Sequence, residues 1–304
     1  MQATSFHKGM HVNREDVYEA RDRCPVCLSQ DERHACLRIQ DDPVIEMLFC
    51  KACEACSVSH MPKQELLDRY YAQYYSKAGD HVAFSSPERF ARHLSTVLKP
   101  RAISSLRMLD FGGGDGSLAI ALAQKFQVGA GFQIPIAIDV VDYEKPREAS
   151  TPNVVVNGHR NLSEVGGQYD VLLASAILEH IPDAHSTIRK LVGMARPGAF
   201  MYARTPYVVP LARLVPTLDT TYPAHVHDMG SGFWNRFADT FNLRAQLLLS
   251  RPSLVETTLY SSPIRTMLAQ ALKFPALAEL WLSKQTRVPR WKFVGGWEVV
   301  LQFL

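Results

Sequence analysis

Long apolar runs are missing from this sequence. The run from Val171 to Leu178 stops at Glu179, well short of the roughly 18 uncharged residues that a membrane-spanning helix needs. The N-terminal stretch also lacks the apolar core of a secretory signal peptide. We therefore expect a cytoplasmic protein with no membrane span.

A strong charge of either sign is missing as well. The 304 residues include 33 basic and 30 acidic side chains, which leaves a formal net charge of +3. This balance gives no indication of a polyanionic partner, so charge argues against nucleic acid. We expect a small-molecule substrate, and the sequence leaves both monomer and dimer open. With 47% hydrophobic residues, the chain can bury one full α/β domain and a smaller module.

Cysteine is absent from all but the first fifth of the chain. The six cysteines are Cys24, Cys27, Cys36, Cys50, Cys53 and Cys56. Disulfides are rare in the cytoplasm, so clustered cysteines in such a protein indicate metal. We assign residues 1–62 to an N-terminal arm and cysteine-rich module, 63–100 to a helical connector, and 101–304 to the main domain. A helical insertion is expected around residues 262–285.

Strand-like and helix-like segments alternate in the main domain. Apolar runs predict strands over residues 105–111, 134–141, 151–157, 168–175 and 198–205. Helical spacing is found over residues 62–80, 87–100, 117–126 and 185–195. Alternating strands and helices predict a doubly wound, Rossmann-like α/β fold with a mostly parallel sheet covered on both faces. Residues 291–303 suggest a hairpin at the edge of that sheet.

A glycine-rich turn separates the first of these strands from the helix that follows. It reads Asp110-Phe-Gly112-Gly-Gly114-Asp115-Gly116, and its glycines let the backbone turn sharply and let a ligand approach closely. Open α/β sheets bind ligands at this position, at the carboxyl end of a strand. The turn is therefore a candidate cofactor site.

Two kinds of cofactor compete for this turn. A dinucleotide motif, G-x-G-x-x-G/A, would need glycine or alanine where Ser117 stands, so the match fails. Asp110 and Asp115 also disfavour a pyrophosphate but suit a cation. S-adenosylmethionine (SAM) carries a sulfonium and an ammonium group and no phosphate, so the charge of the turn favours it.

The turn resembles the first motif of the class I SAM-dependent methyltransferases, an acidic residue followed by G-x-G-x-G. The resemblance covers residues 105–245 and implies a seven-stranded sheet. It also implies that an acidic residue after the second strand binds the ribose hydroxyls, for which Asp142 is preferred to Asp139. Tyr143 would then stack on the adenine.

Two later segments extend the resemblance. Asn157, Gly158 and His159 occupy the place of the turn that lies near the adenine amino group. The segment Tyr169–Asp183, which ends in Leu-Glu-His-Ile-Pro-Asp, is similar to the signature of the fourth strand. Its residues Ala174 and Ser175 are implied to line the cofactor site.

The cysteine module contains two C-x-x-C pairs that are 22 residues apart, Cys24/Cys27 and Cys50/Cys53. Two such pairs facing each other predict a closed tetrahedral Zn²⁺ site with a structural role. Cys56, Cys36, His34 or His60 remain alternative ligands. A zinc ribbon followed by a tyrosine-rich helix also resembles the methyltransferases of natural-product and polysaccharide biosynthesis, which methylate oxygen or carbon.

Three histidines are candidates for the general base, because histidine titrates near neutral pH. His180 follows the fourth strand, while His225 and His227 lie in a later loop. In the family that this chain resembles, a histidine of the later loop faces the substrate.

The leading prediction is a SAM-dependent methyltransferase that acts on oxygen or carbon of a small biosynthetic intermediate. Two alternatives remain, an RNA base methyltransferase that uses the ribbon to bind RNA and a non-catalytic cofactor-binding protein. The RNA alternative calls for a basic ribbon. Acidic residues outnumber basic ones between residues 24 and 56, which disfavours it.

Overall fold

The computed structural model describes residues 10–76, 87–99, 104–130, 134–149, 151–215, 220–253, 263–283 and 288–304. The helices are α1 (Gln64–Ser76), α2 (Pro87–Val97), α3 (Ser117–Ala130), α4 (Ala184–Gly193), α5 (Val209–Leu214), α6 (Ser231–Phe241) and α7 (Pro263–Ser283). Short 3-10 helices are η1 (Arg14–Asp16), η2 (Leu162–Glu164) and η3 (Leu178–His180). The predicted helices within the described ranges are therefore confirmed.

Seven strands form the main sheet, in the order β10-β11-β8-β7-β4-β5-β6. They are β4 (Leu106–Phe111), β5 (Ile136–Val141), β6 (Val154–His159), β7 (Tyr169–Ser175), β8 (Ala195–Tyr207), β10 (Ala245–Pro252) and β11 (Gly295–Phe303). Strands β4 to β8 are parallel, and β10 and β11 are antiparallel. The seven-stranded Rossmann-like fold is confirmed.

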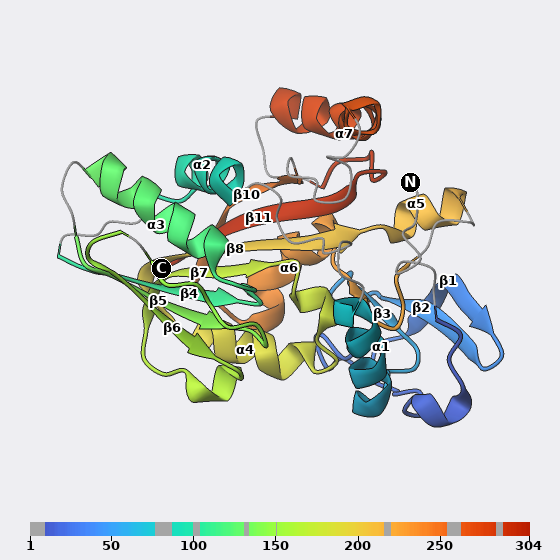
Figure 1. The fold of residues 1–304 in the computed structure, drawn as a ribbon. Helices are drawn as coiled ribbons and strands as arrows, with labels where there is room; N and C mark the ends of the chain where they lie inside the picture. Colours follow the sequence, from blue (N-terminus) through green and yellow to red (C-terminus); the bar gives the residue numbers. More distant parts are fainter. Residues whose placement is uncertain are drawn as a thin grey trace.

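Helices cover both faces of this sheet, α2 and α3 on one and α4 and α6 on the other (Figure 1). Side chains alternate along each strand, so neighbouring residues of β4 enter different cores. Met108 packs with residues of α2 and α3, whereas Leu109 packs with α4 and α6. The buried strands thus read as continuous apolar runs, as parallel strands covered on both faces do.

The end of the chain differs from the expected hairpin. Residues 295–303 form the single strand β11, which lies between β10 and β8 and not at the edge of the sheet. Gly295 and Gly296 suggested a turn, but they begin the strand opposite Tyr207 and Pro206. The edge position belongs to β10, which was not among the predicted strands.

A second, four-stranded sheet contains most of the cysteine-rich segment. It consists of β1 (Arg33–Asp41), β2 (Val44–Cys50), β3 (Cys56–Val58) and β9 (His227–Asp228), in that order. The fourth strand therefore comes from a part of the chain 170 residues beyond β3, since Ser57 pairs with His227. We call residues 24–60 the ribbon; Figure 1 shows its strands beside α1 and α5.

Helix α7 occupies the expected insertion and packs against β10. Among the described helices, none combines the length and the apolar character that crossing a membrane requires. Residues 1–9 of the expected N-terminal arm lie outside the described residues.

Candidate functional site

The glycine turn joins β4 to α3 with three residues in the left-handed region. Gly112, Gly114 and Gly116 have φ angles of +71°, +56° and +74°, which other residues adopt only at a cost. A Cβ on Gly112 would lie 2.5 Å from Ile177, whereas one on Gly114 would meet nothing nearer than 3.7 Å. The turn is thus packed against the protein at Gly112 and open at Gly114.

The carboxylate of Asp110 lies against Gly113 of this turn and forms no ion pair with any described residue. Its side chain is 2% exposed, and its Oδ2 has no hydrogen-bond partner among the described residues. Burial, followed by repulsion from Asp142 and Asp115, raises the pKa of Asp110 to about 7. A buried carboxylate oxygen without a partner is costly unless a cation binds it, so Asp110 suits an ammonium group.

Asp115 has a structural role that its charge alone did not indicate. It accepts a hydrogen bond from the backbone N–H of Ser117 at 3.0 Å, near the start of α3, and pairs with Arg147. Burial alone would raise the pKa of Asp115, but Ser117 and Arg147 hold it below its ordinary value. Asp110 therefore remains as the acid available to a cationic ligand.

Asp142 stands directly after β5 and faces the same turn. Its Oδ2 accepts a hydrogen bond from Gly114 N at 2.9 Å, and its Oδ1 accepts one from Glu144 N at 3.1 Å. The next residue, Tyr143, is 72% exposed. A carboxylate has further lone pairs to offer, so Asp142 can still accept from a ligand bound at Gly114.

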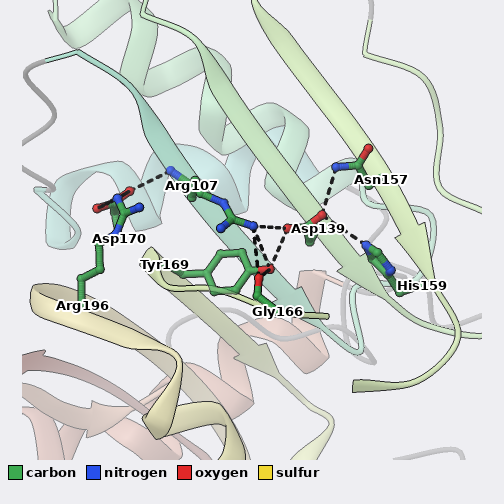
Figure 2. A network of polar contacts seen from close by, with 8 residues as sticks. All are labelled: Arg107, Asp139, Asn157, His159, Gly166, Tyr169, Asp170 and Arg196. Carbon is green, nitrogen blue, oxygen red and sulfur yellow. Dashed lines mark hydrogen bonds and ion pairs between the residues drawn. The ribbon is translucent and has the colours of Figure 1, made fainter. Parts of the chain in front are cut away.

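Asp139, the alternative ribose residue, lies in a closed network within the sheet (Figure 2). Tyr169 Oη donates to its Oδ2 at 2.6 Å, and Arg107 donates to the same oxygen at 3.1 Å. Burial alone would raise the pKa of Asp139, but these donors, with Asn157 and His159, lower it. Its carboxylate is already engaged by the protein.

Asn157 and His159, which were expected near the adenine, complete this network. Asn157 Nδ2 lies 3.0 Å and His159 Nε2 3.2 Å from Asp139 Oδ1 (Figure 2). Gly158 lies between them at the end of β6, where a Cβ would stand 2.6 Å from the ring of Pro146. The two polar side chains thus point to Asp139, and the glycine makes room for Pro146.

Strand β7 ends beside Asp110 with Ala174 and Ser175. Ala174 is buried in the core, and Ser175 Oγ is buried without a partner in the described structure. Glu179 follows in η3, 2% exposed, and its Oε2 is likewise unpaired within the described ranges. Burial raises the pKa of Glu179 to about 8. Several buried polar atoms therefore gather where β4 and β7 end.

His180 and His225 come together next to Glu179. Their rings meet edge to face with centroids 4.6 Å apart, and one ligand atom from each of the three residues lies within 4.8 Å of the others. His180 Nδ1 is 3.0 Å from Ala224 O and 3.2 Å from Tyr71 Oη. A carbonyl only accepts, so Nδ1 carries the proton and Nε2 keeps its lone pair.

Burial also sets the charge of His180. It lowers the pKa of His180 to about 4, so the ring is neutral at physiological pH. The site thus offers an uncharged His180 in contact with His225 and beside a protonated Glu179, an arrangement that can orient a hydroxyl group and accept its proton.

His227 occupies a different position from its two neighbours. Its side chain is 1% exposed, with Nδ1 2.8 Å from Ser57 Oγ and Nε2 3.0 Å from Ile181 O. Both ring nitrogens are therefore engaged by the protein. This geometry favours His180 and His225 over His227 for proton transfer.

The four cysteines of the two C-x-x-C pairs form one cluster with all sulfur atoms within 4.8 Å. Cys24 Sγ is 3.8 Å from Cys53 Sγ, and Cys27 Sγ is 3.7 Å from Cys50 Sγ. Four Zn–S bonds of about 2.3 Å at tetrahedral angles separate sulfur atoms by about 3.8 Å. The cluster therefore fits a tetrahedral zinc ion.

The two pairs have the same backbone geometry. Leu28 N donates to Cys24 O and Glu54 N donates to Cys50 O, each at 2.9 Å. Leu28 and Glu54 both have positive φ angles, 61° and 60°. This matched turn directs the two thiols of each pair to one side.

The other two cysteines lie elsewhere in the ribbon. Cys36 Sγ is 3.7 Å from Cys56 Sγ and 3.3 Å from Met47 O. In the described structure, neither Cys36, Cys56, His34 nor His60 is part of the four-sulfur cluster.

Sequence reasoning missed three residues near the site. Tyr71 was included only as part of the tyrosine-rich helix expected over residues 62–80, Glu179 only as part of a motif, and Ser57 not at all. A tyrosine-rich helix face is a usable signal for a polar site, because a buried tyrosine hydroxyl needs a partner. For Ser57 there was no signal, since its partner His227 is 170 residues away.

Known proteins resemble part of this chain. The O-methyltransferase of ubiquinone biosynthesis from Marinobacter nauticus is 26% identical over 140 residues, 45% of this chain and 59% of that protein. The enzyme of the same name from Methylocella silvestris is 32% identical over 107 residues, 35% of this chain and 42% of its own. The chain thus spans less than two thirds of these relatives.

Solved structures with a similar fold include the plantazolicin methyltransferase BamL in complex with a triazolic desmethylPZN analog and S-adenosylhomocysteine. It is 12% identical, has a TM-score of 0.41, and covers 79% of this chain and 91% of its own.

The family comparison is the most extensive of these matches. The family model of the methyltransferase domain matches residues 80–246, which is more than half of the chain. The match includes the glycine turn, Asp142, the strand β7 and the loop of His225. The chain belongs to the methyltransferase domain family.

Proposed function

We propose that the chain transfers a methyl group from SAM to an oxygen or carbon of a small biosynthetic intermediate. The observation that carries this proposal is the buried Oδ2 of Asp110, which has no partner among the described residues and lies under a glycine turn that is open at Gly114. Bound there, SAM supplies an electrophilic methyl group whose sulfur departs with the electron pair of the S–C bond. Asp110 would hold the ammonium group, and Asp142 the ribose hydroxyls.

Residues at the same edge of the sheet would make the remaining contacts with the cofactor. Tyr143, which is 72% exposed, offers its ring to the adenine. Ser175 Oγ, buried and unpaired in the described structure, can donate to the amino acid part of the cofactor. We assign Asp139 a structural role, because its carboxylate already binds four donors.

His225 is the proposed proton acceptor. It is half-buried and packs on His180, whose proton on Nδ1 is fixed by Ala224 O. His225 would take the proton of the acceptor hydroxyl or acidic C–H, and the electron pair left on that oxygen or carbon would then attack the methyl carbon. Such general base catalysis contributes typically about 10²- to 10⁴-fold to the rate.

The names of the relatives indicate which kind of methyl acceptor should be tested first. Those from Marinobacter and Methylocella are named O-methyltransferases of ubiquinone biosynthesis. We therefore favour a hydroxyl group as acceptor, with an enolisable carbon as the alternative.

A structural zinc ion belongs to the same proposal. Cys24, Cys27, Cys50 and Cys53 would bind it, since the sulfur spacing fits a tetrahedron. With four protein ligands the ion has no open position. Its role would be to hold the two turns of the ribbon together.

The test begins with calorimetry of SAM and S-adenosylhomocysteine against the full chain. Transfer from methyl-labelled SAM is then measured on two panels, phenols with adjacent hydroxyl groups and enolisable ketones. We expect SAM binding and labelling of the hydroxyl panel. Failure of the pure protein to bind SAM would overturn the proposal.

Two variants test the base. His225→Asn should keep the SAM affinity and lower transfer about 100-fold or more, and His180→Asn should lower it less. His34→Asn is the matched control, because His34 is exposed on the ribbon and should transfer normally. Unchanged transfer by His225→Asn would refute its role.

A further inference from the structure

The histidine loop, which we define as residues 220–229, is bound along one side to the ribbon. Val58 N donates to Val226 O at 3.0 Å, and Tyr222 Oη donates to His60 O at 3.1 Å. Ser57 pairs with His227 in the sheet and through their side chains. The ribbon thus supplies the strand β3, with which the strand β9 of this loop pairs.

The same loop is bound on its other side to η3 and the residue after it. Val226 N donates to Glu179 O at 2.8 Å, and His180 Nδ1 donates to Ala224 O at 3.0 Å. His227 Nε2 lies 3.0 Å from Ile181 O. The loop therefore lies between the ribbon and the segment that carries His180.

His227 connects the two sides directly. Ile181 O can only accept, so Nε2 of His227 carries the proton, and Nδ1 accepts from the hydroxyl of Ser57. Burial lowers the pKa of His227 to about 4, which keeps this neutral form near neutral pH. A hydrogen-bonded path therefore runs from Ser57 through His227 to Ile181, the neighbour of His180.

Apolar packing follows the same path. Tyr222 and Val226 of the loop belong to one buried cluster with Ile45, Met47 and Val58 of the ribbon. Displacing the ribbon would expose this cluster to water as well as break the hydrogen bonds. The ribbon therefore supplies part of the apolar packing of the loop, and Val12, Val17, Met61, Leu66 and Val209 also belong to the cluster.

The far end of the ribbon is fixed to the main domain. Glu54 pairs with Arg236 of α6 at 2.8 Å, and His185 of α4 donates to Val26 O at 3.0 Å. Both contacts come from the turns that carry the four clustered cysteines. The cysteine cluster is thus anchored on α4 and α6, while β3 holds the loop.

We propose that the ribbon positions His225 and His180. Ser57 of the ribbon and His227 of the histidine loop are the positioning residues. An ion in the four-cysteine cluster then governs the order of the histidine loop as well as the fold of the ribbon. The consequence for methyl transfer rests on the proposed function, whereas the structural coupling does not. The ribbon is therefore part of the site and not a separate attachment.

Hydrogen exchange measured peptide by peptide tests the coupling in the full chain. The protein is compared with and without a chelator that removes zinc. We expect exchange in residues 220–229 and 177–183 to accelerate about tenfold or more, while β4, α3 and β5 keep their protection. Equal acceleration everywhere would show a purely global role and overturn the proposal.

Ser57→Ala separates positioning from metal loss, because it leaves all clustered cysteines in place. It should retain zinc and bind SAM normally, yet accelerate exchange in residues 220–229. Ser59→Ala is the matched control, since its hydroxyl contacts His60 and Glu46 and not the loop. Unchanged exchange in Ser57→Ala would also overturn the proposal.

His227 allows a rescue experiment. His227→Ala removes both hydrogen bonds, whereas His227→Gln can still donate to Ile181 O. We expect exchange in residues 177–183 to be fast in the alanine variant and slower in the glutamine variant. Identical exchange in the two variants would exclude the path through His227. None of these readouts requires methyl transfer, so they stand apart from a failure of the proposed function.

Discussion

Gly114 N donates to Asp142 Oδ2 at 2.9 Å, and this bond links the glycine turn after β4 to the end of β5. The two elements are neighbours in the sheet, because β4 and β5 pair in parallel from Leu106 and Ile136 onward. A ligand that lies along the turn therefore meets the Asp142 carboxylate at the same edge.

Asp142→Ala should weaken SAM binding about tenfold or more, because a bidentate, charged hydrogen bond to the ribose is lost. Asp139→Asn is the matched comparison. It disturbs the donors in Figure 2 and should lower the melting temperature with little change in SAM affinity. Calorimetry measures the SAM affinity of the two variants, and thermal unfolding measures their melting temperatures. The reverse pattern would move the ribose role to Asp139.

Asp110 predicts a pH dependence of cofactor affinity. Its pKa of about 7 in the cofactor-free protein means that the carboxylate must lose a proton to bind an ammonium group. SAM affinity should therefore rise about tenfold per pH unit below pH 7 and level off above it. Calorimetry in buffers of different ionisation enthalpy would detect the released proton.

Asp110→Asn gives the control for this dependence. It should bind SAM weakly at every pH, with no slope. An affinity of the unaltered protein that does not change between pH 5.5 and 8 would contradict the assignment.

The same shift affects stability. The folded pKa of Asp110 lies above the ordinary value of 3.8, so its contribution is full below that value and is lost as the pH rises through 7. Without cofactor, Asp110→Asn should therefore melt at a higher temperature than the unaltered protein at pH 8, and the gain should shrink at pH 5. A lower melting temperature at pH 8 would refute this.

The local signals of the sequence predicted the glycine turn and the parallel strands. Gly112, Gly114 and Gly116 have positive φ angles, and a glycine in the sequence is itself a signal that such a backbone conformation is required. The hairpin expected at residues 291–303 was wrong, because Gly295 and Gly296 begin the strand β11, where they pair with Tyr207 and Pro206 of β8, and do not form a turn.

Long-range pairings were beyond the reach of local patterns. The two-residue strand β9 has no periodicity of its own, and it exists because Cys56 and Ser57 pair with it. The network around Asp139 draws on β4, β5, β6 and β7. The contacts between its members follow from the order of these strands in the sheet, which local sequence patterns do not predict.

Metal analysis should find about one zinc per chain, as four thiolates around one ion require. Cys53→Ser should lose the metal and lower the melting temperature, because zinc binding and folding of such a site are coupled. Cys36→Ser is the control, since Cys36 lies beside Cys56 and outside the cluster. Loss of zinc from the control with retention in Cys53→Ser would reassign the ligands.

Gly113→Ala probes the turn without the cost of a positive φ angle, which Gly113 does not have. The added Cβ would stand 2.5 Å from Asp110 Cγ, so the buried carboxylate must move away from its place. We expect SAM affinity to fall about tenfold, as it does when a charged hydrogen bond is lost.

Gly193→Ala at the end of α4 is the matched control, because its Cβ meets nothing within 4 Å. It should bind SAM normally and melt at the same or a higher temperature, since alanine favours a helix by about 1 kcal/mol over glycine. If Gly113→Ala bound SAM as the control does, the carboxylate of Asp110 would not be the group that holds the cofactor, because the substitution must displace it.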